Sequence, residues 1–151
     1  MFMLKVGDIT PDFILKDQNQ NNVSLSSFKG KNVLLAFYPF DFSPVCTNEF
    51  SCVQKDLSEF NNNSTQVLGI SIDSHWSHKA FHDKLKLTFP LLSDFSKEVC
   101  QKYGTLRKEG FSERAYFLID KEGIIKFIKF MPNPGVRMEN EELMEEMKSL
   151  K

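Results

Sequence analysis

Cysteine is scarce in this sequence, and long apolar runs are absent. The 151 residues include three cysteines, and this odd number argues against a framework of structural disulfides. No stretch approaches the roughly 18 consecutive apolar residues that a membrane span needs. The first charge, Lys5, comes too early for the apolar core of a signal peptide. We therefore expect a cytoplasmic protein with no membrane partner, in which free thiols invite a catalytic or redox role.

Excess charge of either sign is also missing. The formal net charge is −1, with 19 basic against 20 acidic residues, so neither nucleic acid nor an anionic membrane surface is expected as a partner. What the sequence does contain is apolar bulk: 41% of its residues are hydrophobic, and 15 residues are phenylalanine. This length and composition predict a single domain over residues 1–151 with a phenylalanine-rich core.

Segments typical of strands alternate with segments typical of helices along the chain. Strands are predicted at residues 12–16, 23–25, 32–38, 66–72, 90–92, 114–119 and 124–130. Helices are predicted at residues 44–60, 77–84, 96–103 and 141–150. The first two strands and the last two are typical of hairpins, because turn-rich segments join them. This order predicts an α/β fold with a mixed central sheet, helices on both faces and an N-terminal β-hairpin.

Cys46 is placed at the start of the helix that follows the buried strand 32–38. Ser43 is a good N-cap and Pro44 suits the first turn. The helix dipole and the free amides there favour negative charge, so we expect a lowered pKa and a reactive thiolate. The alternative is that Cys46 is a buried apolar residue, in a stripe with Phe50 and Val53.

Ser43 also bears on the type of chemistry. A thioredoxin-like redox site would place a second cysteine three residues before Cys46, and that position is Ser43. Exchange through a Cys-x-x-Cys pair therefore cannot occur here, which disfavours a thiol–disulfide oxidoreductase. A hydroxyl remains beside the thiol, and it can hydrogen-bond the thiolate or a bound oxygen substrate.

The arrangement Pro39-x-x-x-Ser43-x-x-Cys46 resembles the active-site motif of the peroxiredoxins. The motif's remaining member is an arginine far downstream at the start of a strand, and Arg114 matches it. The likeness extends over nearly the whole chain, in particular to residues 6–13, 71–76 and 89–94. Residues 17–20, 90–95 and 134–137 are most similar to the one-cysteine subgroup of the alkyl hydroperoxide reductase E type.

This resemblance implies a thioredoxin-like fold and a thiol-dependent peroxidase that needs no cofactor. The Cys46 thiolate would attack hydrogen peroxide or an organic hydroperoxide, release water or an alcohol, and become a sulfenic acid. An external thiol, or a thioredoxin- or glutaredoxin-like protein, would then restore the thiol. The rival function is a redox-sensing or chaperone-like partner protein, in which oxidation of Cys46 is a signal.

The resemblance also implies roles for the other motif residues. Arg114, with backbone amides near the cysteine, would hold the peroxide and stabilise charge on its oxygens. Ser43 would hydrogen-bond the substrate, Pro39 would shield the thiolate, and Glu49 would orient Arg114. The alternatives are a surface charge for Arg114, a strand terminator for Pro39 and a solvated helix residue for Glu49.

Cys52 and Cys100 are candidates for a second, resolving cysteine. Cys52 lies six residues after Cys46, so on an intact helix their Cα atoms are roughly 10 Å apart. A disulfide needs less than about 7 Å. Cys100 follows residues 91–94, whereas related proteins with a mid-chain resolving cysteine have it before that stretch. We expect both to be packing residues.

Two further groups of residues allow more than one interpretation. His75, His78 and His82 share a helix face at metal-ligand spacing, but no carboxylate or thiol motif completes a tetrahedral set, so no metal site is expected. Phe40, Phe42 and Trp76 flank the predicted pocket and could line it or pack a subunit interface. Together with the resemblance, they predict a homodimer.

Overall fold

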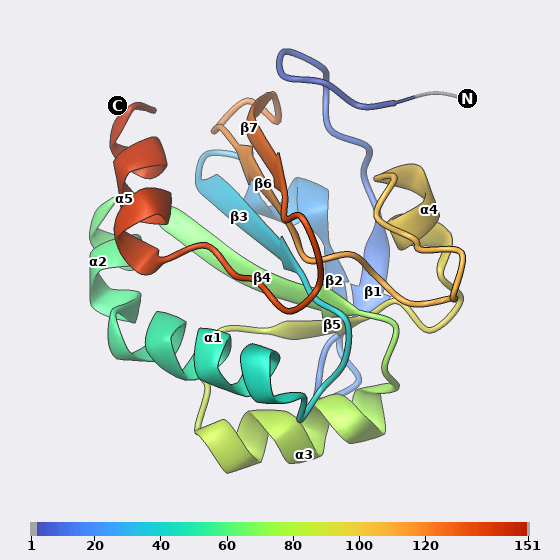
Figure 1. Ribbon diagram of the computed structural model, residues 1–151. Coiled ribbons are helices and arrows are strands. Elements are labelled where there is room, and N and C mark those ends of the chain that lie inside the picture. The colour runs from blue at the N-terminus through green and yellow to red at the C-terminus, as the bar shows by residue number, and fades with distance from the viewer. Residues whose placement is uncertain (1–2, 151) are drawn as a thin grey trace.

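The computed structural model describes residues 3–150, and within this range seven strands form one mixed sheet in the order β2-β1-β5-β4-β3-β6-β7 (Figure 1). The strands are β1 (Ile14–Lys16), β2 (Asn22–Ser24), β3 (Asn32–Phe37), β4 (Thr65–Ser71), β5 (Leu91–Ser93), β6 (Ala115–Ile119) and β7 (Ile125–Phe130). The helices are α1 (Pro44–Lys55), α2 (Leu57–Asn62), α3 (His75–Leu85), α4 (Glu98–Lys102) and α5 (Asn140–Lys148), with a 3-10 helix η1 (Leu25–Phe28).

The strands β3 and β4 form the centre of the sheet. They pair in parallel, and β4 pairs in parallel with β5, while β6 and β7 extend the other side in antiparallel fashion. Every residue of β3 is buried, as its continuous apolar run predicts. The β1–β2 hairpin joins the far side of the sheet through β5. The predicted mixed sheet and N-terminal hairpin are therefore confirmed.

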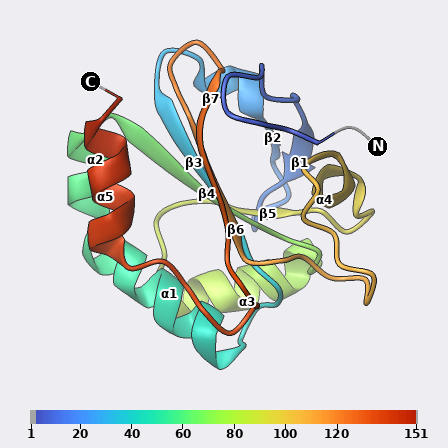
Figure 2. The ribbon, with the colours of Figure 1, turned by 45° about the horizontal axis from the view of Figure 1, so that its top comes forward.

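Two apolar clusters occupy opposite faces of this sheet. Alternate residues of β3 point to opposite faces: Leu34 and Ala36 belong to one cluster, and Val33 and Leu35 to the other. Figures 1 and 2 show α1, α2, α3 and α5 on one side and α4 on the other. Phenylalanines fill both clusters: Phe50, Phe60, Phe81 and Phe89 in the first, and Phe13, Phe37 and Phe117 in the second.

The helix predicted at residues 44–60 is two helices, and this boundary was wrong. Asp56 separates α1 from α2. The side-chain amide of Asn140, at the start of α5, donates to the Cys52 carbonyl at 3.0 Å and to the Asp56 carboxylate at 2.9 Å. Asn140, far away in the sequence, thus binds the end of α1. The apolar stripe in the sequence continues past this point and gives no sign of the break. No helix among residues 3–150 is long and apolar enough to cross a membrane.

Candidate active site

Cys46 lies in the first turn of α1, directly after the loop that leaves β3 (Figure 1). The Ser43 hydroxyl accepts a hydrogen bond from the backbone N–H of Cys46 at 3.3 Å, and Pro44 begins the helix. The predicted helix start is therefore confirmed. Cys46 is fully buried and packs in the same cluster as Phe50 and Val53, as the alternative of a buried apolar residue predicts.

Arg114 reaches the Cys46 sulfur from the neighbouring strand. In the antiparallel pairing of β3 with β6, Ala115 lies opposite Phe37, which places Arg114 beside the loop after β3. Its Nη2 donates to the Cys46 Sγ at 2.9 Å. The arginine is 1% exposed, so the alternative of a surface charge is wrong.

Glu49 holds the other edge of the guanidinium. Its Oε1 accepts a hydrogen bond from Arg114 Nη1 at 2.6 Å, and its side chain is buried, so the solvated alternative is wrong. The Arg114 Nε donates to the Pro134 carbonyl at 3.0 Å. Three acceptors thus surround the cation and fix its orientation relative to the sulfur.

Tyr116 completes this arrangement, and the sequence analysis missed it. Its hydroxyl donates to Glu49 Oε2 and accepts a hydrogen bond from the backbone N–H of Met138 at 3.2 Å. A usable signal was present, because residues two apart on a strand share a face and Tyr116 is two residues from Arg114. The tyrosine orients the carboxylate that orients the arginine.

Burial raises the pKa of the Cys46 thiol above its ordinary value. The Arg114 guanidinium, the Ser43 hydroxyl and the Phe40 backbone oppose this effect by favouring the thiolate. The expected lowering of the pKa is therefore wrong for this folded site. The position at a helix start predicts stabilised negative charge, but local sequence does not reveal complete burial of the sulfur. The fraction of Cys46 present as thiolate therefore depends on how well these few donors are oriented toward its sulfur.

Pro39 is buried at the beginning of the same loop, two residues after the end of β3. This position agrees with a strand terminator and with a shield beside the thiol. Phe40 and Phe42 are 40% and 50% exposed, and their rings contact Phe111 and Phe81. The loop therefore presents apolar rings to solvent close to the buried sulfur.

The other two cysteines lie elsewhere. Cys52 is half-buried further along α1. Cys100 is buried in the cluster on the opposite face of the sheet from Cys46. Burial and the Asp94 carboxylate raise the pKa of Cys100 to about 12, which suppresses its thiolate. All three thiols are free.

The three histidines predicted to share a helix face do so on α3, but they point to different partners. His78 Nδ1 lies 2.8 Å from Asp41 Oδ2, and His82 Nε2 lies 3.2 Å from the Phe89 carbonyl. The His75 ring contacts Trp76, with ring centroids 4.6 Å apart and the planes tilted by 49°. The sequence analysis missed that Asp41 and Asp73 gather beside His78, with ligand atoms within 4.8 Å of one another.

At a helix start, on a mixed sheet covered by helices, the Cys46 thiol accepts a hydrogen bond from an arginine. This combination is typical of the thioredoxin-like thiol peroxidases. The AhpC/TSA family pattern matches residues 6–128, and the chain belongs to this family. The chain is thus a thiol-dependent peroxidase, an oxidoreductase whose class acts on hydroperoxides at the expense of a thiol.

Individual relatives agree with this assignment. Alkyl hydroperoxide reductase E from Mycobacterium tuberculosis (strain ATCC 25618 / H37Rv) is 42% identical over 137 residues, covering 88% of this chain and 89% of the relative. A chloroplastic 2-cysteine peroxiredoxin from Chattonella marina var. antiqua is 40% identical over 134 residues, covering 82% and 69%. Both similarities support the predicted peroxiredoxin resemblance.

Solved structures confirm the predicted thioredoxin-like fold. Mycobacterium tuberculosis AhpC superposes with a TM-score of 0.90 at 28% identity, covering 98% of this chain and 93% of that chain. The reduced 2-Cys peroxiredoxin of Plasmodium vivax superposes with a TM-score of 0.88 at 31% identity, covering 95% and 80%.

The buried pair of Glu49 and Arg114 generates a prediction about stability. Glu49→Ala should lower the free energy of unfolding by about 3–5 kcal/mol, because it leaves the Arg114 guanidinium buried without its carboxylate. Asp83→Ala breaks the exposed pair with Lys79 and should cost less than about 1 kcal/mol. Urea denaturation measures both, and equal costs would contradict a central role for the buried pair.

Proposed function

We propose that Cys46 is the peroxidatic nucleophile and that Arg114, Ser43 and Pro39 form its catalytic surroundings. The observation on which this rests most is the 2.9 Å hydrogen bond from Arg114 Nη2 to the Cys46 Sγ in a buried site. A cation at this distance stabilises the thiolate, and it remains beside the sulfur when a peroxide oxygen arrives there.

The reaction follows from this geometry. The thiolate attacks one peroxide oxygen, an S–O bond forms, and the O–O bond breaks. The departing oxygen keeps the electron pair of the O–O bond, takes up the proton that the thiol released on ionising, and leaves as water or an alcohol, while the sulfur becomes a sulfenic acid. Arg114 and the Ser43 hydroxyl are placed to donate to the oxygens as charge develops on them. Glu49 and Tyr116 act through Arg114 as positioning residues.

The reductant in this proposal is an external thiol. One thiol condenses with the sulfenic acid to release water and form a mixed disulfide, and a second thiol reduces that disulfide. The site of Cys100 across the sheet and the helical spacing of Cys52 support this route over an internal disulfide. Such a route suits the cytoplasm, where thiols are kept reduced.

Organic hydroperoxides, besides hydrogen peroxide, are the proposed substrates. The exposed rings of Phe40 and Phe42 offer an apolar surface to an alkyl chain near the sulfur. The similar mycobacterial protein is named for alkyl hydroperoxides, which agrees with this choice.

We also propose a homodimer that forms through the face around Trp76. Trp76 is 69% exposed, Phe95 72% and Ile14 67%, and they line a groove of about 540 Å³. Exposed apolar side chains gathered in this way are typical of an interface. This face lies at the start of α3, next to Ser77 and His78, which contact the loop before Cys46.

Arg114→Ala should slow the reaction with hydrogen peroxide by about 100-fold or more, because it removes a donor to the developing negative charge. It should also raise the pKa of Cys46 further, since the nearest cation is lost. Stopped-flow kinetics and titration of thiolate absorbance measure the two effects. Cys46→Ser is the control without a nucleophile and should consume no peroxide; turnover in that variant would refute the proposed function.

The double variant Cys52→Ser, Cys100→Ser should turn over like the wild type with a small-molecule thiol or a glutaredoxin-like protein. The reason is that neither thiol is placed to reach the Cys46 sulfenic acid. Mass spectrometry after one equivalent of peroxide should detect a trapped sulfenic acid on Cys46. Rapid loss of two thiols to an intramolecular disulfide in the wild type would show that a resolving cysteine exists.

The wild type should show twice the mass of one chain by light scattering at micromolar concentration. Trp76→Glu should shift this mass toward the monomer, because a charge in the centre of an apolar interface is costly to bury. Ile9→Glu is the matched control, since Ile9 is 77% exposed and lies beside the β6–β7 hairpin. A monomeric wild type would contradict the dimer.

A further inference from the structure

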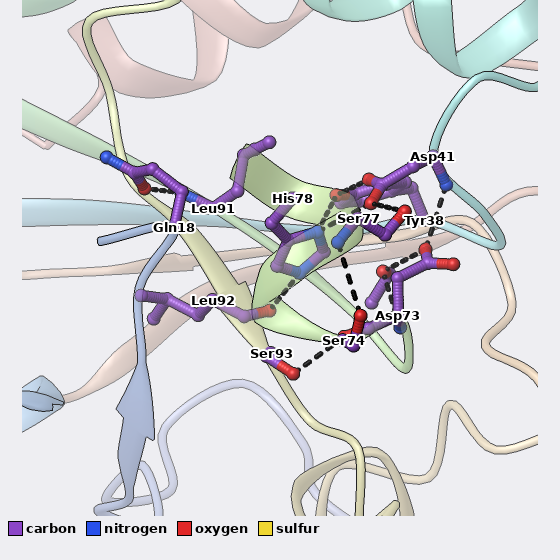
Figure 3. Close-up of polar contacts among 11 residues, drawn as sticks. Gln18, Tyr38, Asp41, Asp73, Ser74, Ser77, His78, Leu91, Leu92 and Ser93 are labelled. Atoms are coloured by element: carbon purple, nitrogen blue, oxygen red, sulfur yellow. Dashed lines mark hydrogen bonds and ion pairs between the residues drawn. The ribbon is translucent and has the colours of Figure 1, made fainter. Parts of the chain in front are cut away.

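A buried polar network, which takes no direct part in the proposed reaction, ties the loop between β3 and α1 to the core (Figure 3). The Asp41 carboxylate is its centre. Oδ1 accepts the Tyr38 hydroxyl at 2.6 Å, and Oδ2 accepts the Ser77 hydroxyl at 2.8 Å and lies 2.8 Å from His78 Nδ1. The side chains of Asp41 and His78 are 1% and 0% exposed.

Both ring nitrogens of His78 have a hydrogen-bond partner. Its Nε2 lies 3.0 Å from the Leu92 carbonyl, which only accepts hydrogen bonds, so Nε2 carries a proton. Its Nδ1 lies 2.8 Å from Asp41 Oδ2, so one proton lies between these two atoms. Both ring nitrogens of His78 are therefore held by partners within the protein.

Asp73 holds the same loop by its backbone. One of its carboxylate oxygens, Oδ2, accepts the backbone N–H of Asp41 at 2.8 Å and the Ser71 hydroxyl at 2.6 Å. The Ser93 hydroxyl in turn donates to the Asp73 carbonyl at 2.6 Å. Residues at the ends of β4 and β5 thus hold Asp73, and Asp73 and two residues of α3 hold Asp41.

The loop needs such support because it is strained. Phe42, the residue after Asp41, has a φ of +67°, in the left-handed region that a bulky side chain rarely adopts. A residue held in this region costs on the order of 1–3 kcal/mol, and the surrounding contacts have to maintain it. The Asp41 network fixes the residue before Phe42, and the N-cap Ser43 fixes the residue after it.

Two groups of this loop lie beside Cys46. Ser43 is held so that its hydroxyl meets the backbone N–H of Cys46 at 3.3 Å. The Phe40 backbone lies near enough to the thiol to favour its charged form. Phe40 and Ser43 lie on either side of Asp41 and Phe42, so the backbone conformation at Phe42 affects their relative orientation.

We propose that Asp41 and His78 are positioning residues of the peroxidatic site, which hold the Tyr38–Ser43 loop in the strained conformation that aims the Phe40 backbone and the Ser43 hydroxyl at the Cys46 sulfur. This inference rests on the proposed function of Cys46. Neither Asp41 nor His78 hydrogen-bonds the Cys46 sulfur, whose side-chain partner is Arg114. The two residues act only through the loop.

Two variants of His78 test the proposal, because each retains one of its two hydrogen bonds. In His78→Asn the amide nitrogen takes the place of Nδ1 and keeps the bond to Asp41. In His78→Gln it takes the place of Nε2 and keeps the bond to Leu92. We expect His78→Gln to slow the reaction with hydrogen peroxide by about 10- to 100-fold, the size of effect that misplaced catalytic groups produce. It should also raise the Cys46 pKa, whereas His78→Asn should stay within about threefold of the wild type.

His82→Gln is the matched control, since His82 lies one turn further along α3 and its Nε2 likewise faces a backbone carbonyl. His82→Gln should leave the rate of reaction with hydrogen peroxide and the pKa of Cys46 unchanged. If neither His78 variant folds, Ser77→Ala removes one bond to Asp41 and should shift the rate and the pKa in the same direction by a smaller factor.

Urea denaturation of both His78 variants separates positioning from general stability. Equal losses of rate in the two variants, in proportion to lost stability, would overturn the proposal, as would a wild-type rate in His78→Gln. Failure of the proposed function is distinguishable, because it would appear as peroxide turnover by Cys46→Ser whatever the His78 variants do.

Discussion

The buried positive charge of Arg114 determines how the segments around Cys46 pack together. Arg114 is among the largest fully buried side chains, and a guanidinium in an apolar interior needs anionic or acceptor groups on every edge. The Glu49 carboxylate, the Pro134 carbonyl and the Cys46 sulfur meet this need. Helix α1, strand β6 and the segment before α5 must therefore converge at one point.

Two opposing effects act on the pKa of the Cys46 thiol. Burial penalises the thiolate, while the cation and the nearby donors stabilise it. Such a balance depends on the direction of each donor as much as on its presence. Cys100, on the other face of the sheet, has no such cation beside it among residues 3–150, and burial and the Asp94 carboxylate raise its pKa to about 12.

Local patterns predicted most of the fold and part of the site. The strand at residues 32–38 is recognisable because burial on both faces leaves an unbroken apolar run. The position of Cys46 follows from Ser43 and Pro44, which act within one turn. Arg114 was found only through the family resemblance, because its contact with Cys46 spans 68 residues and leaves no periodic signal.

The features that were missed share this long range. Tyr116 meets Glu49 across 67 residues, and His78 meets Asp41 across 37. The break between α1 and α2 coincides with Asn140, which binds the end of α1 from 84 residues beyond Asp56. Single polar residues that pair across a fold are not repeated, so spacing along the chain does not reveal their partners; the spacing of Tyr116 from Arg114 indicates a shared strand face but not the contact with Glu49.

The late contribution of residues 134–138 has a consequence for biosynthesis. The Pro134 carbonyl and the Met138 amide complete the surroundings of Arg114 and Tyr116, yet they leave the ribosome well after Cys46. At translation rates of about 5–20 residues per second, the interval is several seconds or longer. During that time Arg114 and Tyr116 lack these two partners, and the surroundings of Cys46 are complete only when the last segment docks.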